Sequence, residues 1–243
     1  METGMSVFLK NVSLLRGLAL AVCCVLAWYL GQVLSVVMPP QAISLAVSGI
    51  HRMAVNVPRV TAPAPRRQKC SLWSACPPGS FAFQVASGGG IQKFPKICFE
   101  DEIITGKGKD GTGRGMNIVA IDAASGKRIA SRHFDMWVGE NSGAMVKFIQ
   151  EIPTGSFILM ATFDEGSTKL TEEAKKEIEK LGSTEIRNIG FRSSWVFVGA
   201  KGFSLPANMK KEKMNHSDKS KNRYAGWPAE VQLQGCVAQQ RRL

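Results

Sequence analysis

The sequence is poor in the residues from which metal sites and nucleophilic sites are built. Its 243 residues include only three histidines, His51, His133 and His216. These are scattered, and no cysteine or carboxylate near them has the spacing of a metal site. No serine lies in a G-x-S-x-G string. These absences argue against zinc and against covalent catalysis, so we expect no metal, no cofactor, no catalytic residue and no enzyme.

A phosphate-binding loop and internal repeats are also missing. The glycine-rich string at 111–115 lacks the Lys-Ser/Thr ending of a phosphate loop and a preceding strand in a βαβ unit, so we interpret it as a flexible turn. The chain contains no internal repeat.

The long hydrophobic run is confined to the N-terminus. Lys10 and Arg16 precede an apolar run at 17–30, and the small residues Gly31 and Ser35 follow it. A basic region, an apolar run and small residues in this order are typical of a secretory signal peptide, although no clean A-x-A cleavage site is present.

A second interpretation of the same segment stays open. If the run extends through Val37 it comes to about 20 residues, enough to span a bilayer as a signal anchor. Because Gln32 interrupts the run and two prolines follow at 39–40, we favour a signal peptide at 1–35. Under either interpretation the chain from residue 40 onward lies in the lumen or outside the cell.

The cysteines beyond this segment are even in number. They are Cys70, Cys76, Cys98 and Cys236. An even set downstream of an export signal indicates a disulfide framework in an oxidising compartment, and four cysteines allow three connectivities. We therefore predict a secreted, extracellular protein whose folded part contains two disulfides.

Acidic residues are scarce relative to basic ones. The chain has 31 lysines and arginines against 19 acidic residues, and its net charge is still about +11 without residues 1–35. Such a balance often indicates nucleic-acid binding, but an exported chain rarely meets nucleic acid. We expect anionic glycans or acidic membrane and receptor surfaces as partners, and no nucleic acid. Membrane contact is expected only if the N-terminal segment is retained.

The rest of the chain divides into a linker and one domain. Residues 36–69 include several prolines and the dibasic pair at 66–67 with little hydrophobic periodicity, which indicates a tether. Residues 70–243 are long enough for a single domain with its own core.

Strand patterns occur along this domain. Residues 116–122 and 127–134 flank a turn-rich connection at 123–126 and are typical of a β-hairpin. The short apolar runs at 157–163 and 195–198 are typical of buried strands.

Two helices are predicted among these strands. One begins with Thr171 as its N-cap, places apolar residues at Ala174, Ile178 and Leu181, and ends at Gly182. The other spans about 143–152, with apolar residues on one face. The interleaved elements predict a mixed, sheet-rich domain with helices packed on it.

A basic stretch precedes the C-terminal part of the domain. Its six basic residues are Lys210, Lys211, Lys213, Lys219, Lys221 and Arg223. Two interpretations stay open, a contact for heparan sulfate and an ordinary solvated loop. The string Asn215-His-Ser217 is an N-glycosylation sequon, and a glycan there would partly mask the stretch.

Several strings in the domain are specific enough to recognise. They are Lys96-Ile-Cys-Phe-Glu-Asp101, Gly113-Arg-Gly-Met-Asn-Ile118, Phe134-Asp-Met-Trp137, Phe191-Arg-Ser-Ser-Trp-Val-Phe-Val-Gly-Ala-Lys-Gly202 and Tyr224-Ala-Gly-Trp-Pro228. Together they resemble the family with sequence similarity 3, which consists of secreted cytokine-like proteins, and the resemblance covers about 66–238.

This resemblance implies a fold, a disulfide pairing and a role. The expected fold is a compact α+β domain, a β–β–α sandwich of two antiparallel sheets with packed helices. The expected pairing is Cys70 with Cys98 and Cys76 with Cys236. The expected role is hormone-like, non-enzymatic signalling at a cell-surface receptor, linked to metabolism and cell fate.

The domain also resembles the sugar-binding, non-catalytic stem of protein O-mannose N-acetylglucosaminyltransferase. Motif by motif, the glycan-contacting residues of that stem fall on Arg114, Asp164 and Arg192. A carboxylate accepts hydrogen bonds from hydroxyls, and guanidinium groups donate to sugar oxygens. The stem has Arg-Asp where this chain has Arg192-Ser193, so one carboxylate of that pattern is missing.

Other roles for these residues stay open. The two arginines would also fit a structural network in which both pair with Asp164. We expect Phe191 and Trp195 in the core rather than as platforms for a sugar. The main interpretation is a secreted cytokine-like ligand, and the alternative is a lectin-like glycan-binding module without catalytic activity.

Overall fold

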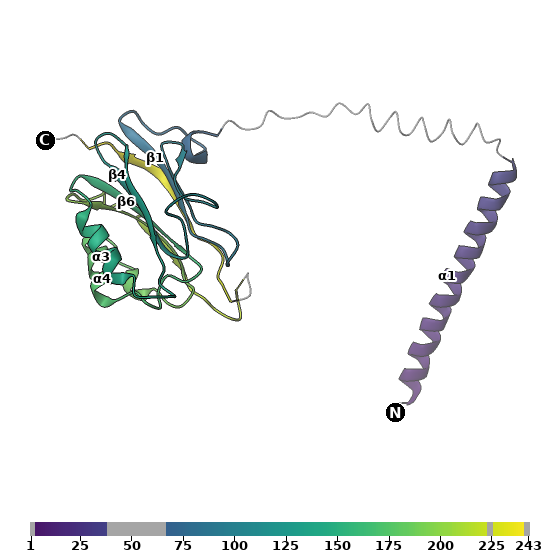
Figure 1. Ribbon diagram of the computed structural model, residues 1–243. Coiled ribbons are helices and arrows are strands. Elements are labelled where there is room, and N and C mark those ends of the chain that lie inside the picture. The colour runs from purple at the N-terminus through teal and green to yellow at the C-terminus, as the bar shows by residue number, and fades with distance from the viewer. Residues whose placement is uncertain (1–2, 38–66, 223–225, 241–243) are drawn as a thin grey trace. The chain divides into compact units, whose positions relative to one another are not determined.

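The chain separates into two compact units, Met1–Ala64 and Pro65–Leu243. A computed structural model describes residues 3–37, 67–222 and 226–240 (Figure 1). The prediction for Arg223 therefore lies outside the described residues, as does most of the expected linker.

The first unit contains helix α1, Thr3–Val37. Its stretch Arg16–Leu34 is long and apolar enough to cross a membrane, and a signal sequence near the N-terminus has the same properties. The side chains described along it are exposed. An exposed apolar helix of this length fits both a signal peptide and a signal anchor.

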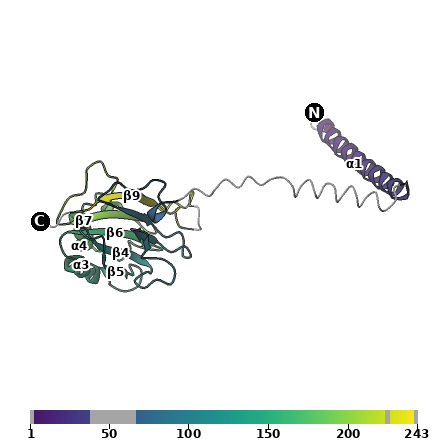
Figure 2. The ribbon, with the colours of Figure 1, turned by 90° about the horizontal axis from the view of Figure 1, so that it is seen from above.

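The second unit contains two antiparallel sheets, seen from two directions in Figures 1 and 2. The first sheet has the order β3-β2-β1-β9, with β1 Ser80–Ala86, β2 Lys96–Phe99, β3 Glu102–Ile103 and β9 Gln232–Ala238. The second sheet has the order β5-β4-β6-β7-β8, with β4 Gly115–Asp122, β5 Arg128–Phe134, β6 Ser156–Phe163, β7 Ser194–Lys201 and β8 Glu212–Asn215.

The helices are α3 Ser142–Glu151 and α4 Glu172–Lys180, with short 3-10 turns η1 Lys69–Ser71 and η2 Ile186–Asn188. The expected α+β fold of two antiparallel sheets with packed helices and two disulfides is confirmed.

The second sheet is the middle layer of the domain. Side chains alternate along its strands, so that Ile158 and Met160 of β6 face α3 and α4 while Phe157 and Leu159 face the first sheet. All eight residues of β6 are buried. Burial on both faces explains why these strands are continuous apolar runs rather than alternating ones.

Both predicted strand patterns are confirmed. Residues 116–122 and 127–134 correspond to β4 and β5, which pair as a hairpin. In the connecting turn the Asp122 carboxylate accepts a hydrogen bond from the Ser125 backbone N–H at 2.6 Å, and Gly126 takes a positive φ of 71°. The runs at 157–163 and 195–198 lie in β6 and β7.

Both predicted helices are confirmed. The Thr171 hydroxyl accepts a hydrogen bond from the Ala174 backbone N–H at 3.3 Å, as expected of the N-cap of α4. At the end of α3, the Lys201 ammonium donates to the carbonyls of Ile149 and Gln150 at 2.8 and 2.7 Å. This contact satisfies helix carbonyls that would otherwise lack a partner and ties α3 to β7.

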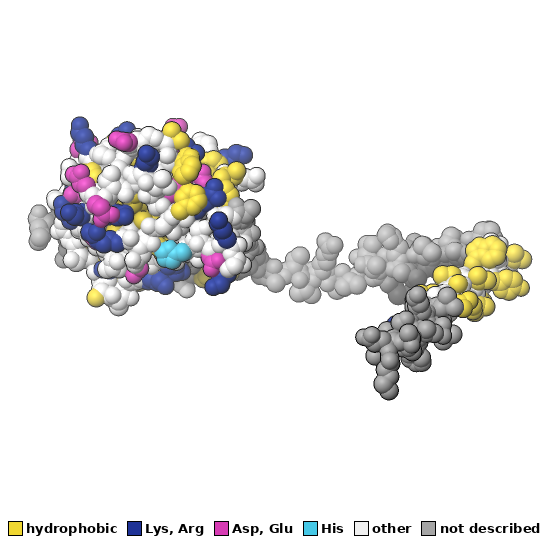
Figure 3. Space-filling model, turned by 90° about the horizontal axis from the view of Figure 1, so that it is seen from below, with side chains coloured by type: hydrophobic (Ala, Val, Ile, Leu, Met, Phe, Trp, Pro, Cys, Tyr) yellow, Lys and Arg dark blue, Asp and Glu magenta, His cyan; other side chains and the backbone are white. Residues whose placement is uncertain are grey.

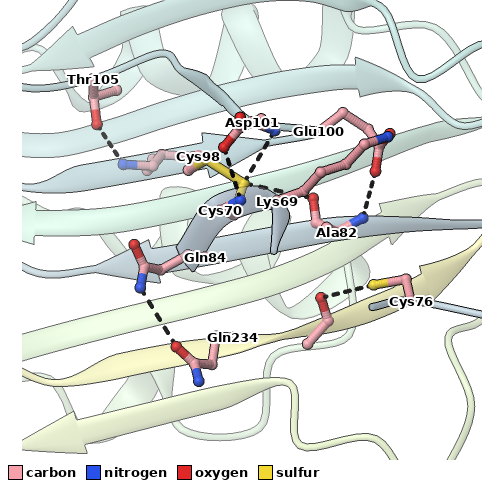
Figure 4. Close-up of a disulfide and its surroundings, with 12 residues drawn as sticks. Lys69, Cys70, Cys76, Ala82, Gln84, Cys98, Glu100, Asp101, Thr105 and Gln234 are labelled. Carbon is pink, nitrogen blue, oxygen red and sulfur yellow. Dashed lines mark hydrogen bonds and ion pairs between the residues drawn. A yellow bond between two sulfur atoms is a disulfide. The ribbon is translucent and has the colours of Figure 1, made fainter. Parts of the chain in front are cut away.

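Two disulfides attach the start of the domain to the first sheet. They join Cys70 to Cys98 of β2 and Cys76 to Cys236 of β9, the pairing that the family resemblance implies. Around the first bridge, the Asp101 carboxylate accepts from the Cys70 backbone N–H at 3.1 Å, as Figure 4 shows. The segment that contains η1 is thereby held on the first sheet.

Candidate functional site

The residues expected to contact glycan come from the same end of the second sheet. Asp164 directly follows β6, Arg192 lies two residues before β7, and Arg114 directly precedes β4. The register pairs Gly115 with Phe163, and Ala161 with Val196. Because neighbouring strands are antiparallel, the start of β4, the end of β6 and the start of β7 meet at one edge.

A cleft of about 180 Å³ lies at this edge, and we call it the strand-end cleft. Its lining residues are Ile91, Trp137, Asp164, Glu165, Phe191, Arg192 and Trp227. Asp164 and Arg192 are thus brought together in one cleft, whereas Arg114 is not among the residues that line it.

Arg192 lies between two aromatic rings. Its guanidinium carbon is 3.8 Å from the ring centre of Trp227 and 4.8 Å from that of Phe191. Gly226 has a positive φ of 92°, and a Cβ built on it would lie 2.6 Å from an Arg192 nitrogen, so a larger residue there would be strained and would displace the guanidinium. No described carboxylate forms an ion pair with this guanidinium. Among the described residues these N–H groups have no carboxylate partner, and they have the geometry to donate to a ligand in the cleft.

Asp164 is positioned by an aromatic side chain rather than by an arginine. Its Oδ1 accepts a hydrogen bond from the Trp227 indole N–H at 2.9 Å, and its backbone has a positive φ of 59°. One carboxylate oxygen thus fixes the orientation of Asp164, and the structure assigns no hydrogen bond from a described residue to the other. A hydroxyl group in the cleft has an acceptor at this position.

Arg114 has a different partner from the one expected. Its Nη2 donates to Asp135 Oδ2 at 2.8 Å and its Nε to the same oxygen at 3.1 Å. The expected network in which both arginines pair with Asp164 is therefore wrong, since Arg114 pairs with Asp135 and Arg192 stacks on rings. The physical reason is the hairpin, because the end of β5 brings Asp135 beside the start of β4.

The Arg114–Asp135 pair holds the loop that carries Trp137. Asp135 Oδ1 accepts from the backbone N–H groups of Trp137 and Val138 at 2.8 and 3.1 Å. Partial burial raises the pKa of Asp135, but the hydrogen bonds from Arg114 and from these N–H groups outweigh it, so the pKa lies below its usual value. The hydrogen bond to Asp135 raises the pKa of Arg114, with a smaller contribution from the charge of Asp164.

Glu165 supports the cleft from below the surface. Only 2% of this residue is exposed. One carboxylate oxygen accepts from the backbone N–H groups of Ser167 and Thr168 at 2.6 and 2.9 Å, and the other accepts from the backbone N–H of Arg192 at 2.6 Å. A buried carboxylate with several donors holds the loop after β6 against the loop before β7.

One expectation about the aromatic residues is wrong. Phe191 is 49% exposed and lies at the rim of the cleft, with its ring centre 5.8 Å from that of exposed Trp137. Trp195 is buried and stacked on Phe197, as expected. The two differ because Trp195 lies in β7, a strand that is buried on both faces, while Phe191 precedes the strand. Figure 3 shows a face on which hydrophobic side chains lie beside basic and acidic ones.

Sequence reasoning missed five of the seven lining residues. Phe191 was expected in the core, and four were not singled out, namely Ile91, Trp137, Glu165 and Trp227. Trp137 and Trp227 do lie in the strings that carry the family resemblance, and Trp227 stands between Gly226 and Pro228. A large aromatic side chain in a loop, outside any apolar periodicity, was the available signal.

The basic residues fall into two groups. Lys210, Lys211 and Lys213 lie at and before β8, and two of them line a second cavity described below. Lys219 and Lys221 follow in the loop after β8, where Lys221 lies 3.7 Å from Asp218. Hydrogen bonds from Ser220 lower the pKa of Asp218.

Asn215 of the sequon is half-buried at the end of β8. Its Nδ2 donates a hydrogen bond to the Ala229 carbonyl at 3.1 Å. An amide nitrogen has two hydrogens, so attachment of a sugar to one leaves the other for this bond.

No group of three or more His, Cys, Asp or Glu side chains in the part of the chain that the structure describes is arranged to hold a metal ion.

Comparison with known proteins places the chain in a family. The family model described as Interleukin-like EMT inducer matches residues 114–203, which include β4 through β7. Human Protein FAM3B is 47% identical over 215 residues, covering 88% of this chain and 91% of that protein. Protein FAM3C of Rattus norvegicus is 42% identical over 175 residues, covering 72% and 76%, and human Protein FAM3A is 39% identical over 176 residues, covering 72% and 75%. Pancreatic-derived factor, whose motifs the sequence resembles, is FAM3B. This chain belongs to the FAM3 family of cytokine-like proteins.

Proposed function

We propose that this protein is a secreted signalling ligand that acts at a cell-surface receptor, with a hormone-like role in metabolism and cell fate. The observation that carries the proposal is membership of the FAM3 family over most of the chain. Surface recognition by the disulfide-bonded domain, rather than catalysis, is the mechanism. The match to the family model described as Interleukin-like EMT inducer supports this view.

Secretion is supported by two features of the structure. An apolar helix near the N-terminus has the length and composition of an export signal, and two disulfides join the four cysteines that follow it. Disulfides of this kind persist in oxidising compartments.

The first experiment is the intact mass of the protein released by cultured cells, before and after reduction. A soluble species that starts after the apolar run, and gains about four hydrogens on reduction because two disulfides open, supports the secreted ligand. Retention in the membrane fraction with α1 intact contradicts it and favours an anchored protein. Treatment with a glycosidase in the same experiment tests the proposed glycan at Asn215, with Asn215→Gln as the matched control.

Receptor action is tested by binding to cells. Labelled protein is expected to bind saturably and to be displaced by unlabelled protein, and binding is expected to survive removal of cell-surface heparan sulfate by heparinase. A loss on heparinase treatment would instead identify a sulfated glycan as the main surface partner, and purely linear, non-displaceable binding would contradict the receptor proposal.

The second candidate function is glycan binding in the strand-end cleft, and a specific arrangement favours it. The cleft combines exposed rings of Trp137 and Phe191 with the guanidinium of Arg192 and the carboxylate of Asp164. Aromatic rings cover the apolar face of a sugar, while the two charged groups bond to its hydroxyl and ring oxygens.

A glycan array with matched variants tests this second function. The Arg192→Ala variant is expected to lose the sugar binding that the wild type shows, because the substitution removes the guanidinium N–H donors from the cleft. Arg187→Ala is the control, since Arg187 pairs with Glu172 and Glu179 away from the cleft. A wild type that binds no glycan, or an Arg192 variant that binds as well as wild type, excludes the cleft as a lectin site.

A further inference from the structure

A second and larger cavity lies along the edge of the first sheet. We call it the edge groove. It has a volume of about 390 Å³ and is lined by Phe83, Met209, Lys210, Lys213 and residues 232–236 of β9. It shares no lining residue with the strand-end cleft, so its occupant is independent of the function proposed for that cleft.

One wall of the edge groove is an unpaired strand edge. β9 pairs with β1 on one side only, and in the described sheets no strand is hydrogen-bonded to its other side. β8 is likewise the last strand of the second sheet. Five consecutive residues of β9 line the groove, so backbone donors and acceptors run along it. An open edge of this kind is a template for an added strand.

The floor of the edge groove is apolar. Phe83 and Leu233 belong to the core cluster between the two sheets, and half-buried Met209 packs against that cluster. Gly235 lies opposite Phe83 in the strand register, and a Cβ built on it would lie 3.5 Å from the Phe83 ring. Because Gly235 has no side chain, the strand edge stays open toward this apolar floor.

The rim of the edge groove is basic. Lys210 and Lys213 are exposed, and neither takes part in an ion pair with any residue that the structure describes. Lysines on a strand edge commonly prevent unwanted pairing. The same charges attract a strand that carries carboxylates, so the pattern selects among partners rather than excluding all of them.

We propose that the edge groove binds an extended acidic segment of a protein partner, added as a strand to β9. Its backbone would bond to the free edge of β9, alternate apolar side chains would face Phe83 and Leu233, and carboxylates would face Lys210 and Lys213. A sulfated glycan fits less well, because only two lysines line the groove and the floor is apolar. Apolar side chains and a backbone with both donors and acceptors belong to a peptide.

The probe is a labelled ten-residue peptide in which glutamate and valine alternate, titrated against the full chain in a nonionic detergent. We expect saturable binding that weakens with added salt. The double variant Lys210→Glu with Lys213→Glu is expected to weaken binding about tenfold or more, since both rim charges reverse. Lys219→Glu with Lys221→Glu is the matched control, with the same change in net charge outside the groove, and is expected to bind like wild type.

Two further peptides separate strand addition from attraction between charges. A peptide of the same sequence, N-methylated at alternate residues, loses the donors of one edge and is expected not to bind, whereas binding as tight as that of the parent overturns the proposal. A peptide of the same composition with all glutamates at one end is expected to bind weakly.

Three results would overturn the proposal. The first is that the alternating peptide does not bind at millimolar concentration, and the second is that both double variants weaken its binding equally. The third is that the Lys210 and Lys213 double variant binds the peptide as wild type does but no longer binds a heparin fragment. The last result would identify a sulfated glycan as the occupant. Near-UV circular dichroism like that of wild type shows that each variant is folded.

Discussion

The two sheets of the domain are held in different ways. The second sheet is buried on both faces, by the helices on one side and the first sheet on the other. The first sheet contributes only one face to a described core cluster, and both disulfides join it to the segment around η1. A sheet with two apolar faces is stabilised by burial, whereas a four-stranded sheet with one such face gains from covalent links.

The largest expected effect comes from the long disulfide. Replacing Cys76 and Cys236 together with serine opens a loop that spans 160 residues. The chain-entropy model gives a loss of up to about 5 kcal/mol in the free energy of unfolding. Denaturant unfolding of the purified wild type and double variant measures this loss. A loss in the free energy of unfolding below about 1 kcal/mol would contradict the importance of covalent links for the first sheet.

A core truncation in the second sheet is expected to cost somewhat less. Phe197 of β7 is fully buried and stacked on Trp195 at 5.6 Å. Phe197→Ala is expected to lower the free energy of unfolding by about 4 kcal/mol, through lost burial and a cavity. Phe197→Leu is the control and should cost less in the same denaturant titration. Equal losses for the two variants would show that the cavity is not the cause.

The short disulfide ranks next. Replacing Cys70 and Cys98 with serine opens a separation of 28 residues. The same model gives about 3.6 kcal/mol, because closing a shorter loop removes less entropy from the unfolded chain. Unfolding curves of the two double variants, recorded side by side, test the order. A larger loss for this bridge than for Cys76–Cys236 would show that local contacts, and not loop length, set the contribution.

Loss of the N-cap of α4 is expected to have a smaller effect. Thr171→Ala leaves the Ala174 N–H without its side-chain acceptor and should cost about 1 kcal/mol. Thr171→Ser keeps the acceptor and should stay close to wild type. Thermal unfolding followed by circular dichroism measures both, and similar melting temperatures for the two variants would contradict a capping role.

The smallest effect concerns pH. The pKa of Asp135 is lowered in the folded protein, so its stabilising contribution is complete above the carboxyl pKa of the unfolded chain, about 3.9. It is lost as pH falls through the lower pKa of the folded state. Denaturant unfolding is recorded from pH 6 down into the acid range. As pH falls, the free energy of unfolding is expected to decrease less for Asp135→Asn than for wild type. Parallel curves would contradict the assignment.

Prediction from sequence succeeded where neighbouring residues decide the structure. The hairpin of β4 and β5 depends on two strand patterns around a short turn, and α4 depends on Thr171 and an apolar stripe within one segment. Sequence patterns did not locate β1, β2, β3, β8 or β9. Of these, β2, β3 and β8 are at most four residues long, and β1 and β9 mix apolar residues with small and polar ones. The two-sheet arrangement came from the family resemblance instead.

The candidate site was predicted in part. Asp164 and Arg192 do meet in the strand-end cleft, but the partner of Arg114 was wrong and Phe191 was misplaced. Asp135 is 21 residues from Arg114, and only the hairpin register brings them together. Phe191 lies in a loop, where neither strand nor helix periodicity indicates which way a side chain points.

By itself, the sequence determined the apolar N-terminal helix, the even set of cysteines beyond it, the local elements of the second sheet and the family, because each depends on composition or on residues close together in the chain. Only the tertiary structure decided which side chains share a cleft, which arginine stacks on aromatic rings and which strand lies at the edge of a described sheet. Those features depend on pairing between distant segments such as β1 and β9, whose register places Ser80 beside Ala238. Such pairing is selected by the burial of the whole core rather than by any local pattern.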